Sequence, residues 1–253
     1  MEEHRIYERK RDIDTKRVRE FYETRARLLN QSDVKEKSAR YATVTLTKEN
    51  AEKWDVMEKD LILPLLNIRE TDSVLDIGCG IGRWAETVIP LCRRYVGTDF
   101  SEEMIKSCKE NFCGWNLKGK DVSFLNMSFQ DLISSDQFRE ESFDVVLIAG
   151  VSMYINEDDL KQCFTRLASL LSKGGRLYLW ESIGLGRRLT LDEIWSSALD
   201  SNYSAVYRTR EEYLALLQPL FSISDVVDER IVSEFDHGNN SDTSRWFTVI
   251  KKR

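Results

Sequence analysis

The chain contains 253 residues, of which 42% are hydrophobic and 32% are charged, and its formal net charge is −6 at pH 7. This length fits one large α/β domain with added cover elements and is short for two full domains. The negative charge gives no general attraction to nucleic acid or to anionic lipid, so we expect neither as a partner. No apolar run reaches the ~18 residues of a membrane span and the N-terminus has no signal-peptide pattern, so we expect a cytoplasmic protein.

The cysteines and histidines give no sign of a metal site. The five cysteines contain no Cys-x-x-Cys pair, and the two histidines, His4 and His237, lie far apart in the sequence. Zinc sites usually combine such closely spaced ligands, so we expect no metal and interpret the cysteines as buried thiols.

The N-terminal part of the chain has a helical pattern. Apolar residues recur at helical spacing from Val18 to Leu29 within an otherwise polar segment, which indicates an amphipathic helix. The segment from Ser38 to Thr47 has no helical stripe. Helical spacing returns from Lys48 to Leu66, with Pro64 disturbing the last turn.

A short apolar run, from Val74 to Ile77, breaks into glycines at positions 78, 80 and 82. This pattern predicts a strand that runs into a tight turn. Glycine is needed where the backbone turns sharply against a ligand, and the N–H groups at the start of the following helix attract polar ligand groups. A dinucleotide fingerprint would require glycine where this chain has Arg83, which weakens a nicotinamide-cofactor interpretation.

A second apolar run ends in Asp99, seventeen residues after Gly82. An acid at the end of the second strand of such a fold can accept hydrogen bonds from both hydroxyls of a ribose. Ser101 then has the character of a helix N-cap.

The remaining elements follow in alternation. The predicted strands are Asp121–Leu125, Phe143–Gly150, Arg176–Trp180, Phe221–Val232 and Arg245–Ile250. Asn156 is expected to cap one helix, which Gly174 and Gly175 end, and Thr209 with Glu212 to form the capping box of another. The irregular segment from Glu181 to Arg210 begins at the carboxyl end of a strand, where ligands bind in open α/β sheets.

The turn Asp76-x-Gly78-x-Gly80-x-Gly82, followed by Asp99, resembles the class I S-adenosylmethionine-dependent methyltransferases. The resemblance covers Trp54 to Gly175 and is looser beyond. It implies an α/β, Rossmann-like, seven-stranded and mostly parallel sheet with helices on both faces, strand order 3-2-1-4-5-7-6 and strand 7 antiparallel. We expect one domain over residues 1–253, with a helical N-terminal cover (1–50), a cofactor-binding core (51–180), a cap insertion after strand 5 (181–210) and a C-terminal helix with an edge hairpin (211–253).

The resemblance also implies S-adenosyl-L-methionine as the cofactor and S-adenosyl-L-homocysteine as its product. The residues expected around it lie on the glycine turn, at strand ends and on the cover: Asp76, Gly78, Gly80, Gly82, Arg83, Asp99, Phe100, Met104, Ser128, Phe129, Ala149, Gly150, Tyr22 and Tyr41. Ser128 stands where the family more often has an acid that accepts from the adenine amino group, and Asp131 is the alternative acceptor.

Methyl transfer from a sulfonium requires alignment and exclusion of water more than many catalytic groups. Three residues near strand ends are candidate catalytic groups: His237, Tyr154 and Glu181. Each has a structural alternative, namely a solvated loop histidine, a packed aromatic ring and a structural hydrogen bond.

The proposed substrate-binding residues follow strands 4 and 5: Ser152, Tyr154, Tyr203, Tyr207 and Arg208. Four arginines fall in the same segment: Arg187, Arg188, Arg208 and Arg210. Because arginines bind carboxylate or phosphate in two-point fashion, an acceptor with a negative charge is expected. The alternative is that these arginines are solvated or pair with nearby glutamates.

The stretch Tyr207-Arg208-Thr209-x-x-Glu212-Tyr213 resembles methyltransferases of bacterial surface-polysaccharide or natural-product pathways. This resemblance implies an O-methyltransferase that acts on an anionic or nucleotide- or sugar-linked small molecule. Two alternatives stay open: an N-methyltransferase of an amine or a protein N-terminus, and a non-catalytic subunit that binds S-adenosylmethionine. The protein is expected to be a monomer or a homodimer.

Overall fold

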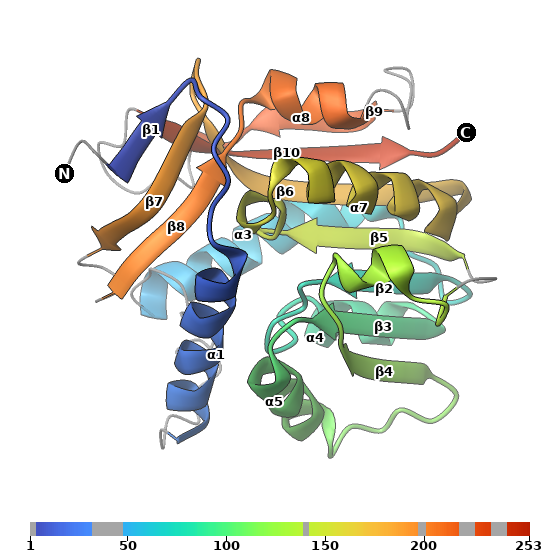
Figure 1. Cartoon of the computed structure of the whole chain (residues 1–253). Coiled ribbons are helices and arrows are strands. Elements are labelled where there is room, and N and C mark those ends of the chain that lie inside the picture. Colours follow the sequence, from blue (N-terminus) through green and yellow to red (C-terminus); the bar gives the residue numbers. More distant parts are fainter. Residues whose placement is uncertain (1–3, 32–47, 139–141, 197–200, 218–225, 234–241) are drawn as a thin grey trace.

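The computed structural model describes residues 4–31, 48–138, 142–196, 201–217, 226–233 and 242–253 (Figure 1). Its centre is a seven-stranded sheet with the order β4-β3-β2-β5-β6-β10-β9. These strands are β2 (Ser73–Ile77), β3 (Arg94–Asp99), β4 (Asp121–Asn126), β5 (Phe143–Ala149), β6 (Leu171–Gly184), β9 (Val226–Ile231) and β10 (Thr243–Lys251). Strands β2 to β6 are parallel and β10 is antiparallel to both its neighbours. The order and direction predicted from the sequence are confirmed.

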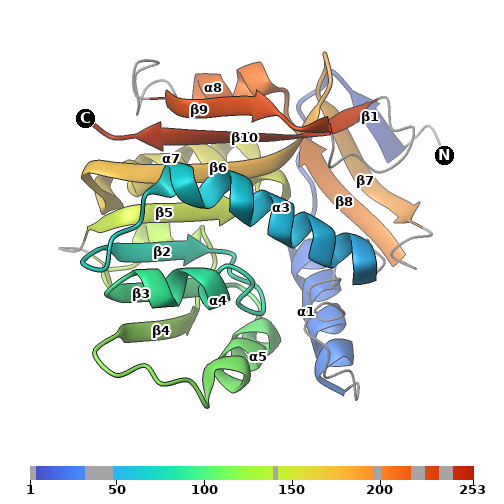
Figure 2. The same cartoon turned by 180° about the vertical axis from the view of Figure 1, so that it is seen from behind.

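Helices cover both faces of this sheet (Figures 1 and 2). One face packs against α3 (Lys48–Leu66), α4 (Ala85–Val88) and α5 (Glu102–Phe112), and the other against α6 (Asp131–Ser134), α7 (Glu157–Leu170) and α8 (Arg210–Leu217). The short 3-10 helix η2 (Ile89–Leu91) follows α4.

Strand β5 shows why its sequence is continuously apolar. Val145 and Leu147 pack into the cluster on the α3 side, whereas Val146 and Ile148 pack into the cluster on the α7 side. A central parallel strand is buried on both faces, so successive side chains all need to be apolar.

The insertion after the fifth parallel strand differs from the expected irregular cap. Strand β6 continues to Gly184, and β7 (Leu189–Ser196) and β8 (Ser201–Tyr207) then form an antiparallel hairpin. The N-terminal strand β1 (Arg5–Tyr7) pairs with β7, so the insertion and the N-terminus together form a second, three-stranded sheet.

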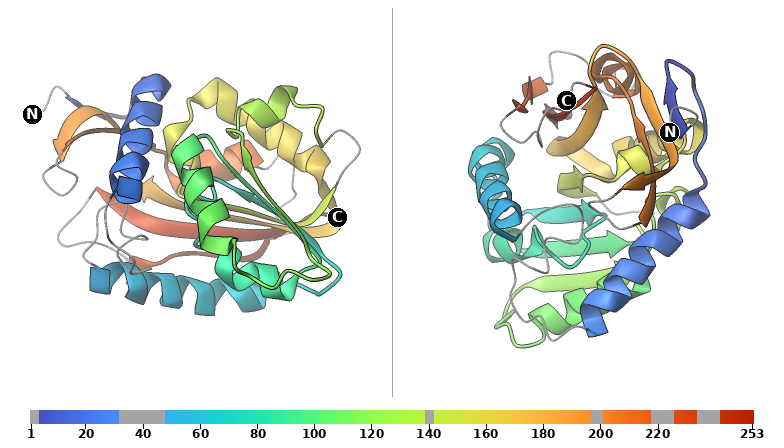
Figure 3. Two further views of the ribbon diagram at one scale, coloured as in Figure 1. Left: turned by 90° about the horizontal axis from the view of Figure 1, so that it is seen from below. Right: turned by 90° about the vertical axis from the view of Figure 1, so that its left-hand side faces the viewer.

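Helix α1 (Thr15–Gln31) joins the second sheet to the main domain (Figure 3). Val18 packs with Ala205 and Val206 of β8, and further along the helix Ala26 packs with Ile81 of the glycine turn and Met104 of α5. The predicted amphipathic helix is therefore present and lies over the turn. In the described part of the chain, no helix combines the length and apolar character that crossing a membrane requires.

Two predicted helix ends are corrected. Asn156 precedes α7, but its side chain bonds to Ile13 instead of capping the helix: its Oδ1 accepts from Ile13 N at 3.0 Å and its Nδ2 donates to Ile13 O at 3.0 Å. Helix α7 ends at Leu170, and Gly174 lies in the early part of β6. The capping box of Thr209 and Glu212 at the start of α8 is confirmed by their reciprocal hydrogen bonds.

Candidate functional site

The glycine turn after β2 has the backbone conformation that its sequence indicates. Gly78, Gly80 and Gly82 have φ angles of +71°, +56° and +91°, a region that other residues enter at a cost. A Cβ at Gly78 would lie 2.3 Å from Val151 Cγ2, and one at Gly82 would lie 2.6 Å from Phe112 Cε2. No described atom lies within 4 Å of the Cβ position of Gly80. The first and third glycines thus allow close packing, and Gly80 borders open space that a ligand can approach.

Asp99, at the end of β3, is hydrogen-bonded to this turn. Its Oδ2 accepts from Gly80 N at 3.0 Å and its Oδ1 accepts from Ser101 N at 2.9 Å. Burial raises the pKa of Asp99 to about 6, although these two hydrogen bonds favour the carboxylate. A carboxylate oxygen can accept more than one hydrogen bond, so Asp99 also has lone pairs for ribose hydroxyls. The turn and Asp99 therefore fit an adenosine-containing cofactor.

Asp76 lies within β2, two residues before Gly78. It is 2% exposed and accepts a hydrogen bond from Tyr95 Oη at 2.5 Å. Burial raises its pKa to about 6, and the Tyr95 bond opposes that shift. In this conformation Asp76 supports the strand.

Several predicted cofactor residues have other roles in the structure. Arg83 pairs with two carboxylates of α3, at 2.8 Å to Asp55 and 2.9 Å to Glu58, and so fastens that helix to the turn. Phe129 is buried in the main core against Phe164, with ring centroids 6.1 Å apart. The sequence could not show either role, because the partners are distant along the chain.

The loop after β4 holds the predicted adenine acceptors. Ser128 N donates to Asp131 Oδ2 at 2.8 Å, and Asp131 N donates to Ser128 Oγ at 3.0 Å. This reciprocal pair starts α6 and fixes the loop. At the end of β5, Ala149 is followed by Gly150, which has a φ of +72° and donates to Trp180 O at 2.7 Å.

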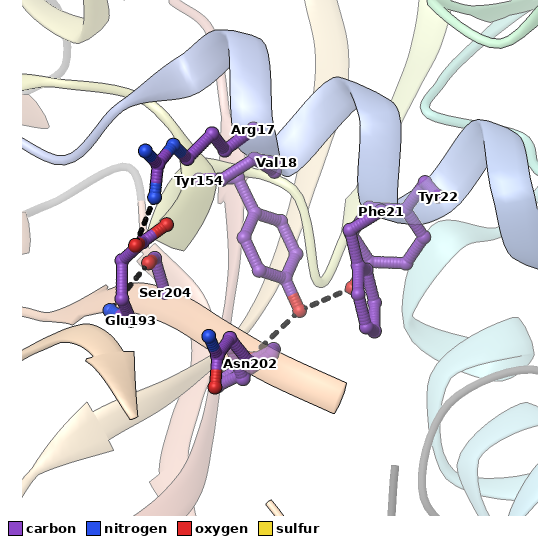
Figure 4. A pocket seen from close by; sticks show the side chains of 9 residues that line it. Arg17, Val18, Phe21, Tyr22, Tyr154, Glu193, Asn202 and Ser204 are labelled. Carbon is purple, nitrogen blue, oxygen red and sulfur yellow. Dashed lines mark hydrogen bonds and ion pairs between the residues drawn. The ribbon is translucent and has the colours of Figure 1, made fainter. Parts of the chain in front are cut away.

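An aromatic pocket lies between α1, the 3-10 helix η3 (Ser152–Tyr154) and the β7–β8 hairpin (Figure 4). It is open to solvent on one side, and its described lining consists of Arg17, Val18, Phe21, Tyr22, Tyr154, Glu193, Asn202, Tyr203 and Ser204. The Tyr22 hydroxyl donates to Tyr154 Oη at 2.5 Å, and Tyr154 Oη lies 2.9 Å from Tyr203 Oη.

The aromatic pocket adjoins the loops of the cofactor site. The Tyr22 ring lies 6.0 Å from that of Phe100, which follows Asp99, and 5.2 Å from that of Tyr154, which follows the β5 end. Burial raises the pKa values of Tyr22, Tyr154 and Tyr203 well above the usual tyrosine range. These phenols are therefore neutral and act as hydrogen-bonding groups and not as bases.

Glu181 supports the segment that carries Tyr154. It is fully buried in β6, and its Oε1 accepts from Ser152 N at 2.7 Å and Val151 N at 3.2 Å. Burial raises its pKa to about 7, although the hydrogen bonds from Ser152 and Val151 oppose the shift. Glu181 does not line the aromatic pocket in the described structure, and its Oε1 has a structural role, whereas a catalytic role for Glu181 stays a prediction. Ser152, predicted to bind substrate, is 0% exposed.

Arg208 holds the same segment from the other side. It is 0% exposed, donates to Ser152 O at 3.0 Å and Ile155 O at 2.7 Å, and pairs with Glu157 at 3.1 Å. These bonds occupy its guanidinium, which corrects the expectation that Arg208 contacts substrate. Tyr207, also predicted to bind substrate, is not among the described residues that line the aromatic pocket. Its hydroxyl donates to Tyr203 Oη at 3.4 Å.

The other arginines of this region also have acidic partners. Arg188 is 5% exposed and pairs with Glu157 and Glu212, both at 3.1 Å. Arg210 pairs with Glu229, and Arg187 lies over the Tyr7 ring. The structural alternative is thus met only in part. Arg187 is exposed and Arg210 pairs with Glu211 as well as Glu229, but Arg188 is buried and Arg208 pairs with the distant Glu157.

Two predicted site residues, Tyr41 and His237, lie outside the described residues. Among the residues that are described, no group of three or more histidine, cysteine or acidic side chains is arranged to hold a metal.

Sequence reasoning missed Glu193 and Asn202, which the hairpin brings to the aromatic pocket. Alternation of apolar residues at Leu189 and Leu191 indicates a strand, but it breaks at Asp192-Glu193. Such a break is typical of a β-bulge and was the available signal.

Comparison with known proteins identifies the core. Residues 74–175 match a family described as a methyltransferase domain. An uncharacterized methyltransferase of Schizosaccharomyces pombe is 30% identical over 112 residues, which are 44% of this chain and 39% of that protein. A phosphoethanolamine N-methyltransferase of Triticum aestivum is 27% identical over 128 residues, 51% of this chain and 24% of that protein. The chain therefore spans less than half the length of these relatives.

Solved structures share the fold across nearly the whole chain. The magnesium protoporphyrin IX methyltransferase of Synechocystis with bound S-adenosylmethionine has a TM-score of 0.60 at 14% identity and covers 96% of this chain and 100% of that one. A [4+2]-cyclase has a TM-score of 0.67 at 14% identity and covers 96% and 99%. Together with the glycine turn and the strand order, the family match identifies residues 74–175 as a methyltransferase domain with the fold of the class I S-adenosylmethionine-dependent methyltransferases.

Proposed function

We propose that this protein transfers the methyl group of S-adenosylmethionine to a small-molecule acceptor bound in the aromatic pocket. The observation that carries the proposal is the position of Tyr22, whose ring contacts both Phe100 beside Asp99 and Tyr154 beside the end of β5. The pocket and the cofactor loops therefore share one wall, as a transfer between two bound molecules requires.

The described residues divide the work between binding and alignment. Asp99 and the backbone around Gly80 would hold the ribose, and α1 covers the turn through Ala26 and Ile81. The cofactor, when bound, supplies an electrophilic methyl group on a sulfonium. An acceptor atom with a free lone pair would receive this methyl group, S-adenosylhomocysteine would remain, and any proton on the acceptor atom would go to solvent after the transfer.

Tyr22 and Tyr154 would align the acceptor in this reaction. Their hydroxyl oxygens lie 2.5 Å apart and the hydroxyls stay neutral. They can therefore orient the acceptor through hydrogen bonds without removing a proton from it. The aromatic surroundings also exclude water from the transfer.

The acceptor atom has two candidates. The sequence favours an oxygen acceptor on an anionic or sugar-linked molecule, and this candidate requires either an acceptor that is already anionic or a base. Four arginines that argued for an anion, Arg187, Arg188, Arg208 and Arg210, contact other protein groups. Glu181 is hydrogen-bonded to backbone, and the pocket tyrosines are weak bases.

A nitrogen acceptor is the second candidate, and it fits these side chains better. A neutral amine already carries a nucleophilic lone pair and needs no protein base. The wheat relative named as a phosphoethanolamine N-methyltransferase is consistent with this candidate. We propose a free small molecule as the acceptor, in a cytoplasmic setting and with a monomeric or homodimeric enzyme.

The test is an assay of S-adenosylhomocysteine release with parallel panels of amines and of hydroxyl compounds. We expect release with members of one panel, and we expect Asp99→Ala to weaken cofactor binding by at least about 1 kcal/mol in calorimetry. Cofactor binding without release from any acceptor would support the non-catalytic alternative. Unchanged binding by Asp99→Ala would contradict the assigned cofactor site.

A further inference from the structure

Strand β7 contains a bulge at Glu193. The pairing of β7 with β8 shifts between Leu191 and Ile194, and Glu193 has a φ of +57°. This left-handed conformation is unfavourable for a residue with a side chain, and glycine is common at such bulge positions. The backbone N–H of Glu193 donates to Ser204 Oγ at 2.8 Å, which holds the bulge in place.

Glu193 lines the aromatic pocket, and its side chain extends from the bulge toward Arg17 of α1 (Figure 4). Among the nine described residues that line this pocket, Glu193 is the sole acid, and its carboxylate pairs with Arg17 of α1. Strained backbone positions concentrate at functional sites, where the side chain that they present has a use. Because glycine would suit this backbone conformation better, we infer that the glutamate side chain has a function here.

The rest of the pocket wall suits a positive charge. Phe21, Tyr22, Tyr154 and Tyr203 surround it, and their successive ring centroids are 5.0, 5.2 and 6.1 Å apart. Aromatic faces attract ammonium groups, and the attraction grows when water is excluded. The neutral phenols add oxygen atoms that accept hydrogen bonds from such a group.

The positive charge of Arg17 does not turn the pocket into an anion site. Its side chain is 59% exposed and its partner carboxylate is 29% exposed. Ion pairs with this exposure contribute little to stability, so an incoming ammonium group can share or take over the carboxylate.

We propose that Glu193 is the specificity-determining carboxylate of the aromatic pocket and that the acceptor carries a positively charged ammonium group beside the neutral nitrogen or oxygen atom that receives the methyl group. This inference rests on the proposed function, because it concerns the acceptor of the same transfer. It goes further by naming the charge of the acceptor and the residue that selects it.

The test uses two probes of the same shape and different charge. Choline is a cation that cannot accept another methyl group on nitrogen, and its dimethylbutanol isostere has carbon in place of that nitrogen. Both are titrated into the protein at saturating S-adenosylhomocysteine. We expect the wild-type protein to bind choline more tightly than the isostere by about tenfold, as a cation held by aromatic rings and a carboxylate should be.

Three variants separate specificity from structure. Glu193→Gln should lose most of the choline preference. Glu193→Gly should lose it as well while melting no earlier than the wild-type protein, because glycine suits the left-handed position. Asp192→Asn is the matched control on the same strand, since Asp192 pairs with Arg11 at 2.9 Å outside the pocket lining, and it should keep the preference.

The outcomes distinguish this inference from the proposed function. If S-adenosylhomocysteine binds but the wild-type protein binds neither probe or shows no preference for choline, the charge assignment is wrong and the methyltransferase proposal stands. Retention of the preference in Glu193→Gln would overturn the role of Glu193. Failure of S-adenosylhomocysteine to bind would instead contradict the proposed function.

Discussion

Replacing Arg208 by alanine tests whether the arginines of the insertion bind substrate or hold the fold. The guanidinium is fully buried and is divided among Glu157, Ser152 O and Ile155 O. Its removal leaves two backbone carbonyls without their donor and takes away one of the cations beside Glu157.

The expected loss follows from these contacts. Breaking a buried ion pair from one side costs about 3–5 kcal/mol, and an orphaned buried acceptor costs about 1–3 kcal/mol. The terms do not add fully, because Glu157 keeps Arg188 and Lys10. We therefore expect Arg208→Ala to lower the free energy of unfolding by at least about 3 kcal/mol, which lowers Tm by about 6–12 °C for a chain of this size.

The assay is chemical denaturation at neutral pH, with thermal melting alongside. Arg208→Lys keeps the charge without the planar fork and should fall between the wild-type protein and Arg208→Ala. Arg187→Ala is the control, since that side chain is 47% exposed and its loss should cost less than about 1 kcal/mol. A loss below about 1 kcal/mol for Arg208→Ala, with a raised KM for acceptor, would refute the structural role.

Three further predictions concern the cofactor site and its support. Asp99 has a pKa of about 6, and ribose binding favours its carboxylate. Calorimetry should therefore show an S-adenosylhomocysteine affinity that is constant above about pH 7 and falls below about pH 6, by up to about tenfold per pH unit. Asp99→Asn should remove this pH dependence, and a wild-type profile in that variant would contradict the assignment. Gly78→Ala should lower the free energy of unfolding by about 2 kcal/mol or more in denaturation, because the new Cβ would meet Val151. Gly80→Ala should lower it by about 1–2 kcal/mol and mainly weaken cofactor binding. Equal stabilities of the two variants would argue against the turn geometry. Glu181 has a pKa of about 7 in the folded state against 4.5 in the ordinary case. Its contribution to stability should therefore fall by up to about 3 kcal/mol as pH rises from about 4.5 to about 7, and stay constant above that. Glu181→Gln should lose this pH dependence and keep turnover, and abolished turnover in a folded variant would restore Glu181 as a catalytic base.

The sheet could be predicted from the sequence because the residues that indicate its strands lie close together along the chain. Glycines at alternate positions after β2 and an acid at the end of β3 are fixed by the backbone and the ligand that they serve. The sequence does not indicate the hairpin, since the bulge at Glu193 breaks the alternation that marks a strand. A single extra residue was enough to make a regular element resemble a loop.

The roles of charged residues were less accessible, because their partners are distant along the chain. Arg208 is separated by 51 residues from Glu157, and Arg83 by 25 from Glu58. Spacing within one element can reveal neither pair. The carboxylate of Glu193 is likewise assigned to the pocket only once the second sheet is assembled.

The most direct test of the account is a structure of the protein with S-adenosylhomocysteine bound. We expect the ribose hydroxyls on the Asp99 carboxylate, the backbone of Gly80 against the ligand, and the sulfur directed toward the hydroxyls of Tyr22 and Tyr154. A ligand whose sulfur is directed away from the aromatic pocket, or whose ribose has no contact with Asp99, would contradict the proposed transfer.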